Sequence, residues 1–81
     1  MDARGKSSTH RVVAEIVGNV GEVLVEVGHE VAPTDPLVVL ESMKMEIPVL
    51  AEVAGVVYEI MVTTGDVVQE GDTIAVIDAT D

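Results

Sequence analysis

The feature that most constrains this chain is an internal duplication, because from Val12 onward the sequence repeats itself without gaps at a spacing of 37 residues. Glycines, apolar residues and acidic residues all recur at this spacing. The pairs are Ile16 and Val53, Gly18 and Gly55, Val20 and Val57, Glu22 and Glu59, Val23 and Ile60, Val25 and Val62, Gly28 and Gly65, Val31 and Val68, Asp35 and Asp72, Leu37 and Ile74, and Leu40 and Ile77. We therefore expect one unit of roughly thirty residues to occur twice, with a pseudo-two-fold axis between the copies.

The repeated unit has the composition of a β structure. Its apolar residues are mostly β-branched, with eighteen Val and five Ile against four Leu and no Phe or Trp, and such side chains fit a pleated sheet better than a helix. Apolar residues alternate over Val23–Val27 and dominate Val56–Val62, which predicts one strand in each copy and places Met61 in the core. Helical spacing is nowhere sustained.

Turns and a second strand complete each predicted unit. Turn residues lie at 28–30 and 64–66 and again at 33–36 and 69–72. Each copy then closes with a nearly continuous apolar strand, Leu37–Leu40 or Thr73–Ile77, which we expect to be the most buried. The predicted fold is all-β, with eight short strands in two four-stranded antiparallel sheets that form a flattened barrel or sandwich.

Residues 12–81 are expected to form one domain, and residues 1–11 a flexible N-terminal tail, because the tail is polar and has no periodicity. Gly5-Lys6-Ser7 is similar to the end of a phosphate-binding loop, but the upstream glycine and the preceding strand are missing. The chain has no cysteine, so neither a disulfide nor a thiolate metal site is available. His10 and His29 stand apart in the sequence, which makes metal binding by histidines improbable.

The charge excludes several classes of partner. A net charge of −11 repels phosphate backbones and anionic lipid, so we expect neither nucleic-acid nor membrane-surface binding. No segment has the length of a membrane span, and the N-terminal residues do not form a signal peptide. We therefore expect a cytoplasmic, monomeric protein.

One lysine stands out against this acidic background. After Arg11, Lys44 is the only lysine or arginine, against fourteen acidic residues. It lies at the junction of the two copies, where Met43-Lys44 would form the centre of a tight hairpin. Pro48 predicts that its strand lies at a sheet edge or forms a bulge beside the tip. Such turns prefer Asn-Gly because φ is positive, so Met-Lys is a poor turn sequence and indicates function. We interpret Lys44 as a covalent attachment point displayed at the hairpin tip.

The sequence Glu41-Ser42-Met43-Lys44-Met45, followed at fixed distances by Val49, Ala51, Gly55 and Val57, resembles the biotinyl (biotin carboxyl carrier) domain family, and most of all its small free-standing actinobacterial members. The likeness covers Val12 to Asp78 and includes the duplication and the central lysine.

The resemblance implies covalent biotin on Lys44, joined through an amide by a biotin protein ligase that uses biotinyl-adenylate. A biotin carboxylase would then load a carboxyl group, and a carboxyltransferase would pass it to an acyl-CoA or keto acid. Met43 and Met45, with Glu41, Ser42 and Glu46, would serve recognition by the ligase. The domain itself would have no catalytic residues.

The chain departs from the family pattern at two positions. Ser42 stands where alanine is the commonest residue of the family. Thr34 stands where a turn glycine is usual, and the second copy has that glycine at the equivalent position, Gly71. Pro33 and Pro36 flank Thr34, so we expect this turn to adopt a different geometry. The gapless repeat also leaves no room for the protruding thumb of some bacterial carriers, so a thumbless domain is expected.

Several alternatives remain open from the sequence. A lipoyl carrier of a 2-oxoacid dehydrogenase or of the glycine cleavage system would have a similar fold, although Asp-Lys-Ala usually surrounds its lysine. An adaptor that kept the fold without any cofactor is a third class. At single residues, Lys44 could be an ordinary solubilising lysine, Met43 and Met45 could fill the core, and Glu41 and Glu46 could form a solvated rim.

Overall fold

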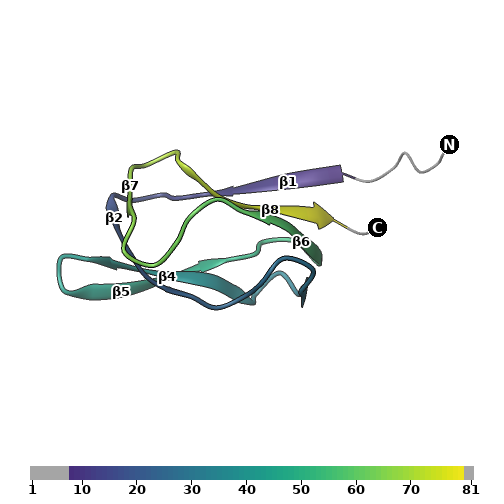
Figure 1. The fold of residues 1–81 in the computed structure, drawn as a ribbon, viewed down its shortest axis with the longest axis horizontal. Coiled ribbons are helices and arrows are strands. Elements are labelled where there is room, and N and C mark those ends of the chain that lie inside the picture. Colours follow the sequence, from purple (N-terminus) through teal and green to yellow (C-terminus); the bar gives the residue numbers. More distant parts are fainter. Residues whose placement is uncertain (1–7, 80–81) are drawn as a thin grey trace, which may run out of the picture.

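A computed structural model of the protein describes residues 8–79, all of whose regular structure consists of short strands (Figure 1). In chain order the strands are β1 (Ser8–Val13), β2 (Gly18–Val23), β3 (Glu30–Val31), β4 (Pro36–Ser42), β5 (Met45–Leu50), β6 (Gly55–Ile60), β7 (Val67–Val68) and β8 (Thr73–Ala79). This part of the chain has no helix that is long and apolar enough to cross a membrane.

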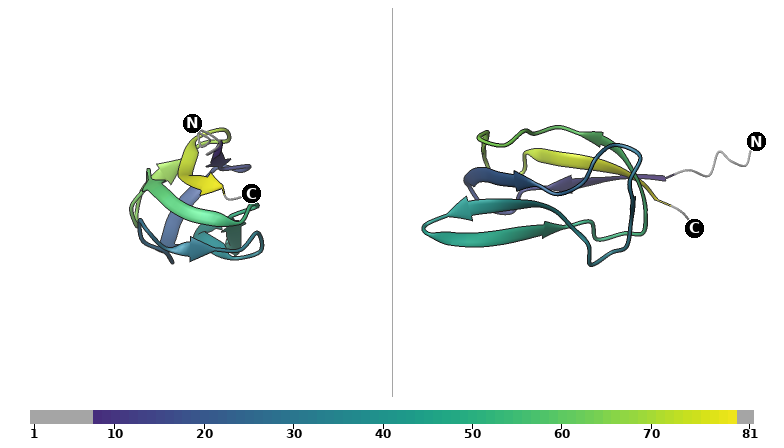
Figure 2. Two further views of the ribbon diagram at one scale, coloured as in Figure 1. Left: turned by 90° about the vertical axis from the view of Figure 1, so that its right-hand side faces the viewer. Right: turned by 60° about the horizontal axis from the view of Figure 1, so that its bottom comes forward.

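The strands form two four-stranded sheets, with the strand orders β1-β8-β6-β3 and β5-β4-β2-β7. All neighbouring strands are antiparallel. Each sheet takes two strands from each half of the sequence, and the two views in Figure 2 show how the halves wrap around one another. The all-β prediction with two antiparallel sheets is confirmed, and no thumb is inserted between β2 and β3.

The duplication seen in the sequence is also present in the backbone. Adding 37 to the bounds of β1, β2, β3 and β4 gives the bounds of β5, β6, β7 and β8 without any adjustment. Hydrogen bonds between strands and loops recur in the same way: the Ala14 N–H donates to the Asp72 carbonyl at 2.9 Å, and the Ala51 N–H donates to the Asp35 carbonyl at 2.9 Å. The two halves are therefore related by the expected pseudo-two-fold axis.

The core lies between the two sheets and is centred on β4 and β8. Leu37, Leu40, Ile74 and Ile77 are fully buried, and each comes from a strand with a partner on both sides. The closing strand of each copy is thus the most buried, as predicted, because its apolar face is covered by the opposite sheet.

The predicted strands at 23–27 and 56–62 were placed too far along the chain. β2 ends at Val23 and β6 at Ile60, and the chain then leaves the sheet toward glycine turns with φ of 95° at Gly28 and 98° at Gly65. The prediction that Met61 is a core residue was wrong, because Met61 is 51% exposed. The neighbouring Val62 is buried in its place, so Met61 points outward.

The predicted domain boundary at residue 12 was also wrong, because β1 begins at Ser8. Four polar residues of the predicted tail pair with β8, in a register that joins Ser8 to Ala79 and Arg11 to Val76. They are polar because β1 is an edge strand with an exposed face, on which the Arg11 guanidinium donates to Thr73 Oγ1 at 3.0 Å. The rest of the predicted tail, residues 1–7, lies outside the described residues.

The turn at Thr34 differs from the equivalent turn at Gly71, as expected. Gly71 has φ of 92°, whereas Thr34 is not among the residues with positive φ in the described chain. In both turns an aspartate carboxylate accepts a backbone N–H three residues earlier, at 2.9 Å from Asp35 to Ala32 and at 2.8 Å from Asp72 to Gln69. The same carboxylate contact closes both turns, but the turn at Thr34 is built without the positive φ that favours glycine at position 71. Proline at the position before Thr34 is compatible with such a turn.

Candidate functional site

The chain reverses direction between β4 and β5 in a two-residue hairpin turn. Ser42 and Met45 form the last pair of the ladder, so Met43 and Lys44 alone make the turn. Their φ values are 51° and 66°, which is the arrangement of a type I′ turn. The predicted hairpin is confirmed, and its two central residues adopt a backbone conformation that non-glycine residues seldom take.

The hairpin displays its side chains to solvent. Met43 is 89% exposed and Met45 57% exposed, and Lys44 is also exposed. Figure 1 shows the hairpin at one end of the molecule, opposite the end where β1 begins and β8 finishes. The alternative that both methionines fill the core is therefore wrong.

In the described part of the chain, no neighbouring side chain binds the amine of Lys44. Within residues 8–79 no carboxylate oxygen lies within 4.0 Å of its Nζ, and its side chain makes no hydrogen bond. Its position is set by the backbone of the turn, while the side chain remains free to move. The site thus offers one primary amine on a rigid support, which is the geometry needed for acylation by a second protein.

Two carboxylates flank the turn on adjacent strands. Glu41 and Glu46 are directly paired across β4 and β5, and both are exposed. Like charges in this arrangement destabilise a hairpin slightly. In the free protein both acids form a solvated rim beside the turn.

All six residues that the sequence singled out line one shallow hollow at this end of the molecule. They are Glu41, Ser42, Met43, Lys44, Met45 and Glu46, and Asn19 of β2 joins them. Asn19 pairs with Glu41 and was not predicted from the sequence. No group of three or more His, Cys, Asp or Glu side chains suited to a metal ion occurs among residues 8–79.

Sequence reasoning also missed the two glycines of β2 that make room beneath the hollow. A Cβ added to Gly21 would lie 2.8 Å from Glu41 Oε2, and one added to Gly18 would lie 3.0 Å from the Glu41 carbonyl oxygen. A departure from the repeat could have identified Gly21, because the equivalent residue in the second copy is Tyr58. The first copy therefore keeps space for the Glu41 side chain that the second copy does not need.

The edge position of β5 follows from Pro48. Proline has no N–H to donate, and β5 pairs with β4 on one side only. The prediction of an edge strand after the lysine is confirmed. One long side of the hairpin is consequently open to an approaching protein.

Comparison with known proteins places these features in a family. A family model for biotin/lipoyl domains, described as "Biotin-requiring enzyme", matches residues 10–77. The chain is similar to the "Biotinylated protein TB7.3 homolog" of Mycolicibacterium smegmatis, with 62% identity over 39 residues. It is also similar to "Biotinylated protein TB7.3" of Mycobacterium tuberculosis H37Rv, with 59% identity over 39 residues. Each match covers 48% of this chain, and the chain spans 55% of the length of these relatives.

Two solved structures contain the same fold within much larger chains. One is a single-chain, multi-domain long-chain acyl-CoA carboxylase, with a TM-score of 0.83 and 36% identity over 90% of this chain and 7% of that chain. The other is the urea carboxylase of Kluyveromyces lactis, with a TM-score of 0.82 and 34% identity over 86% of this chain and 6% of that chain. In both structures a domain of this shape is a small part of the whole protein.

Proposed function

The chain belongs to the biotin/lipoyl attachment family, and from this membership we propose that it is a biotin carboxyl carrier with biotin bound covalently to Lys44. The observation that carries the proposal is the position of Lys44, an exposed amine at the apex of the hairpin that joins the two halves. The relatives named as biotinylated proteins support biotin as the cofactor.

The residues of the hairpin fit the attachment of such a group. Lys44 Nζ attacks the carboxyl carbon of biotinyl-adenylate, an amide bond forms, AMP leaves, and the amine gives up its protons to groups of the ligase. We assign the base to the ligase, since no side chain within residues 8–79 hydrogen-bonds to Lys44. Once bound, biotin supplies a ureido nitrogen that accepts and releases a carboxyl group.

The domain would carry the cofactor, and separate enzymes would perform the chemistry. Domains of this family are typically non-catalytic carriers, and here the rigid sandwich confines motion to the modified side chain at its end. Tethering gives the cofactor an effective concentration of roughly millimolar at a partner's active site without tight docking. A biotin protein ligase, a biotin carboxylase and a carboxyltransferase are the partners that we propose.

The flanking side chains are assigned to recognition by the ligase. Met43 and Met45 are exposed apolar side chains on both sides of the reactive amine, and desolvation of such side chains is a common source of binding energy. Glu41, Ser42 and Glu46 complete the surface around them. A lipoyl ligase would meet the same fold, but the relatives named above are biotinylated proteins and the sequence has methionine on each side of the lysine.

The test is the intact mass of the protein after co-expression with a biotin protein ligase, compared with Lys44→Arg. The proposal predicts a single biotinyl adduct that is absent from the variant. A lipoyl adduct after expression with a lipoyl ligase, in place of biotin, would assign the protein to the rival carrier class. No adduct under either condition would leave the adaptor function and refute the carrier function.

A further inference from the structure

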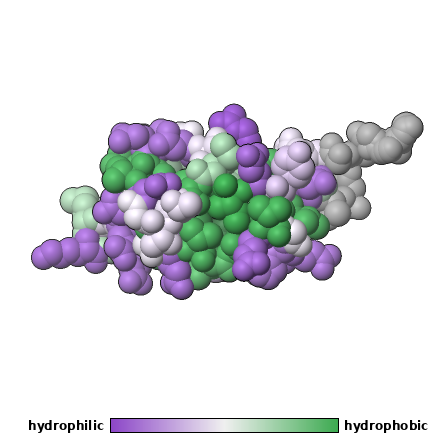
Figure 3. Space-filling view, viewed as in Figure 1, coloured by the Kyte–Doolittle hydropathy of each residue, from purple (hydrophilic) through white to green (hydrophobic). Residues whose placement is uncertain are grey.

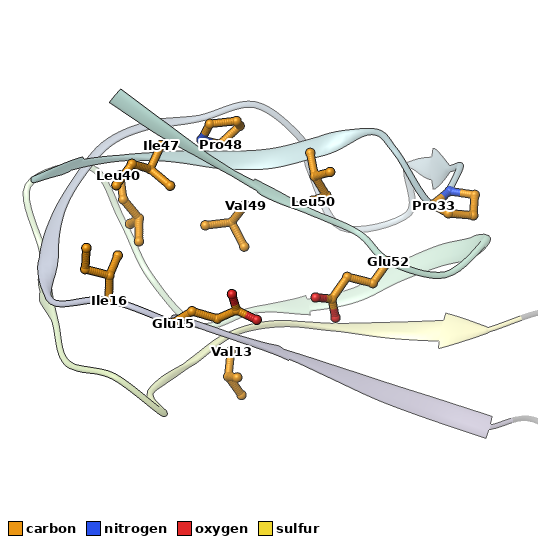
Figure 4. Close-up of a pocket in the computed structure, with 10 residues that line it drawn as sticks. All are labelled: Val13, Glu15, Ile16, Pro33, Leu40, Ile47, Pro48, Val49, Leu50 and Glu52. Carbon is orange, nitrogen blue, oxygen red and sulfur yellow. The ribbon is translucent and has the colours of Figure 1, made fainter. Parts of the chain in front are cut away.

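A largely apolar groove lies beside the hairpin, between β5 and the connection from β1 to β2 (Figure 4). It encloses about 400 Å³. Ile47 and Val49 of β5 line one side and Ile16 lies on the other, while two carboxylates, Glu15 and Glu52, point toward one another along one wall. Figure 3 shows apolar surface exposed between hydrophilic patches on one face of the molecule, and exposed apolar side chains such as Val27 and Val67 lie outside the groove. The two carboxylates are therefore what distinguish this groove.

Among residues 8–79, only one of these two equivalent carboxylates has a side-chain partner. Glu15 and Glu52 occupy equivalent positions, 37 residues apart. Glu52 Oε1 lies 2.9 Å from His10 Nε2. The residue equivalent to His10 in the other copy is Ile47, which has no polar atom. Within the described part of the chain, Glu15 has no ion pair and no side-chain hydrogen bond.

The groove therefore selects for a particular kind of side chain. A carboxylate beside apolar surface is best matched by a cation on an aliphatic stem, because the stem covers the apolar wall while the charged end meets the carboxylate. Arginine and lysine have this form. The net charge of −11 also favours a partner with a basic surface.

We propose that this groove receives an arginine or lysine side chain of the biotin protein ligase, with Glu15 as its ionic partner. The proposal rests on the function proposed above. It adds a second contact region to the hairpin, defined by Glu15, Ile16, Ile47 and Val49, which the residues around Lys44 do not include.

The distance between Lys44 and the groove favours the ligase over the other proposed partners. Ile47 to Leu50 follow Lys44 by three to six residues along an extended strand, which is about 10 to 20 Å. An interface of standard size buries about 800 Å² on each partner, a patch of about 16 Å radius, or about one-sixth of the 4921 Å² surface of this chain. A patch of this radius around Lys44 reaches the near end of the groove at Ile47, so an enzyme that encloses the bare Lys44 amine lies within reach of it, whereas a carboxylase reaches biotin at the end of a long arm.

The test is the steady-state kinetics of biotin transfer to the full apo chain by the biotin protein ligase of the same source. Glu15→Lys is expected to raise the KM for the carrier by about 10- to 100-fold and to leave kcat within about twofold, because a repelled cation weakens docking without moving Lys44. Glu59→Lys is the matched control: it changes the net charge equally on an exposed position of β6 and is expected to change KM by less than about threefold. Glu15→Gln, which keeps the shape of the side chain, is expected to lie between Glu15→Lys and the parent.

Each other outcome overturns the proposal. Equal effects of Glu15→Lys and Glu59→Lys would show that only net charge matters, and a normal KM for Glu15→Lys would show that the groove is not used. In both cases the parent would still be biotinylated on Lys44, so the carrier function would stand. Failure of the parent to accept biotin would overturn both proposals. Self-association of the parent that Glu15→Lys abolishes would assign the groove to a second copy of the chain.

Discussion

The proposed function needs the side chains of Met43 and Lys44, whereas the backbone of the turn favours residues such as Asn and Gly. Both residues have positive φ, which costs a non-glycine residue of order 1 kcal/mol or more, whereas Asn-Gly adopts a type I′ turn without strain. The double variant Met43→Asn/Lys44→Gly is expected to raise the free energy of unfolding by about 1 to 2 kcal/mol, measured by urea denaturation. The same variant should accept no biotin. An unchanged or lower stability would show that the turn is not strained in the parent protein.

The side chain of Lys44 is expected to contribute little to stability. It is exposed and makes no ion pair or hydrogen bond within residues 8–79. Lys44→Ala should therefore change the free energy of unfolding by no more than about 0.5 kcal/mol, whereas removal of a structural side chain typically costs several times more. Thermal unfolding of the purified variant measures the change. Loss of the folded state in Lys44→Ala would contradict a display role for this residue.

At the scale of the strands, Gly18 and Gly55 provide a matched comparison within one molecule. They are equivalent in the repeat, but a Cβ on Gly55 would clash with the Asp78 carbonyl oxygen, whereas one on Gly18 would lie 3.0 Å from the Glu41 carbonyl oxygen. Neither glycine has positive φ. Gly55→Ala is therefore expected to destabilise the protein by about 1 to 3 kcal/mol more than Gly18→Ala, because it overpacks the contact between β6 and β8. Equal losses in parallel denaturant titrations would exclude this close approach as the reason for glycine.

The repeat explains why so much of the architecture could be predicted from the sequence. It predicted the two copies, the buried closing strands and the hairpin at Lys44, and Pro48 predicted the edge position of β5. The ends of the strands were harder to predict, because Leu24 and Met61 continue an apolar pattern after the backbone has left the sheets. The start of β1 was missed because an edge strand can be polar. The need for glycine at position 55 comes from a long-range contact, and no local pattern reveals such a contact.

The site was predictable for a different reason than its surroundings. Lys44 and its neighbours are consecutive in the sequence, so a motif was enough to find them. Asn19, Gly21 and Glu15 reach this region from the first unit only through the pairing of β2 with β4 and the packing of the β1–β2 connection against β5. Such contacts depend on the tertiary structure, and only the comparison of each residue with its repeat partner gives a trace of them in the sequence.

At the scale of the whole molecule, the two halves cannot form independent domains. Each sheet needs two strands from each half, so a fragment that contains residues 8–43 would expose the apolar faces of β2 and β4. We expect this fragment to be unfolded alone and the full chain to unfold in one cooperative transition. Circular dichroism and amide proton dispersion of the fragment test this expectation. A folded fragment would contradict the interleaved arrangement.

The proposed carrier function depends on the modification state of one residue in the natural protein. The chain has two lysines, Lys6 and Lys44, so each molecule contains an internal comparison. The most direct measurement is tandem mass spectrometry of peptides from the protein isolated from its own source. Biotin is expected on Lys44 and none on Lys6. A bare or lipoylated Lys44 in cells that biotinylate other proteins would contradict the biotin carrier function.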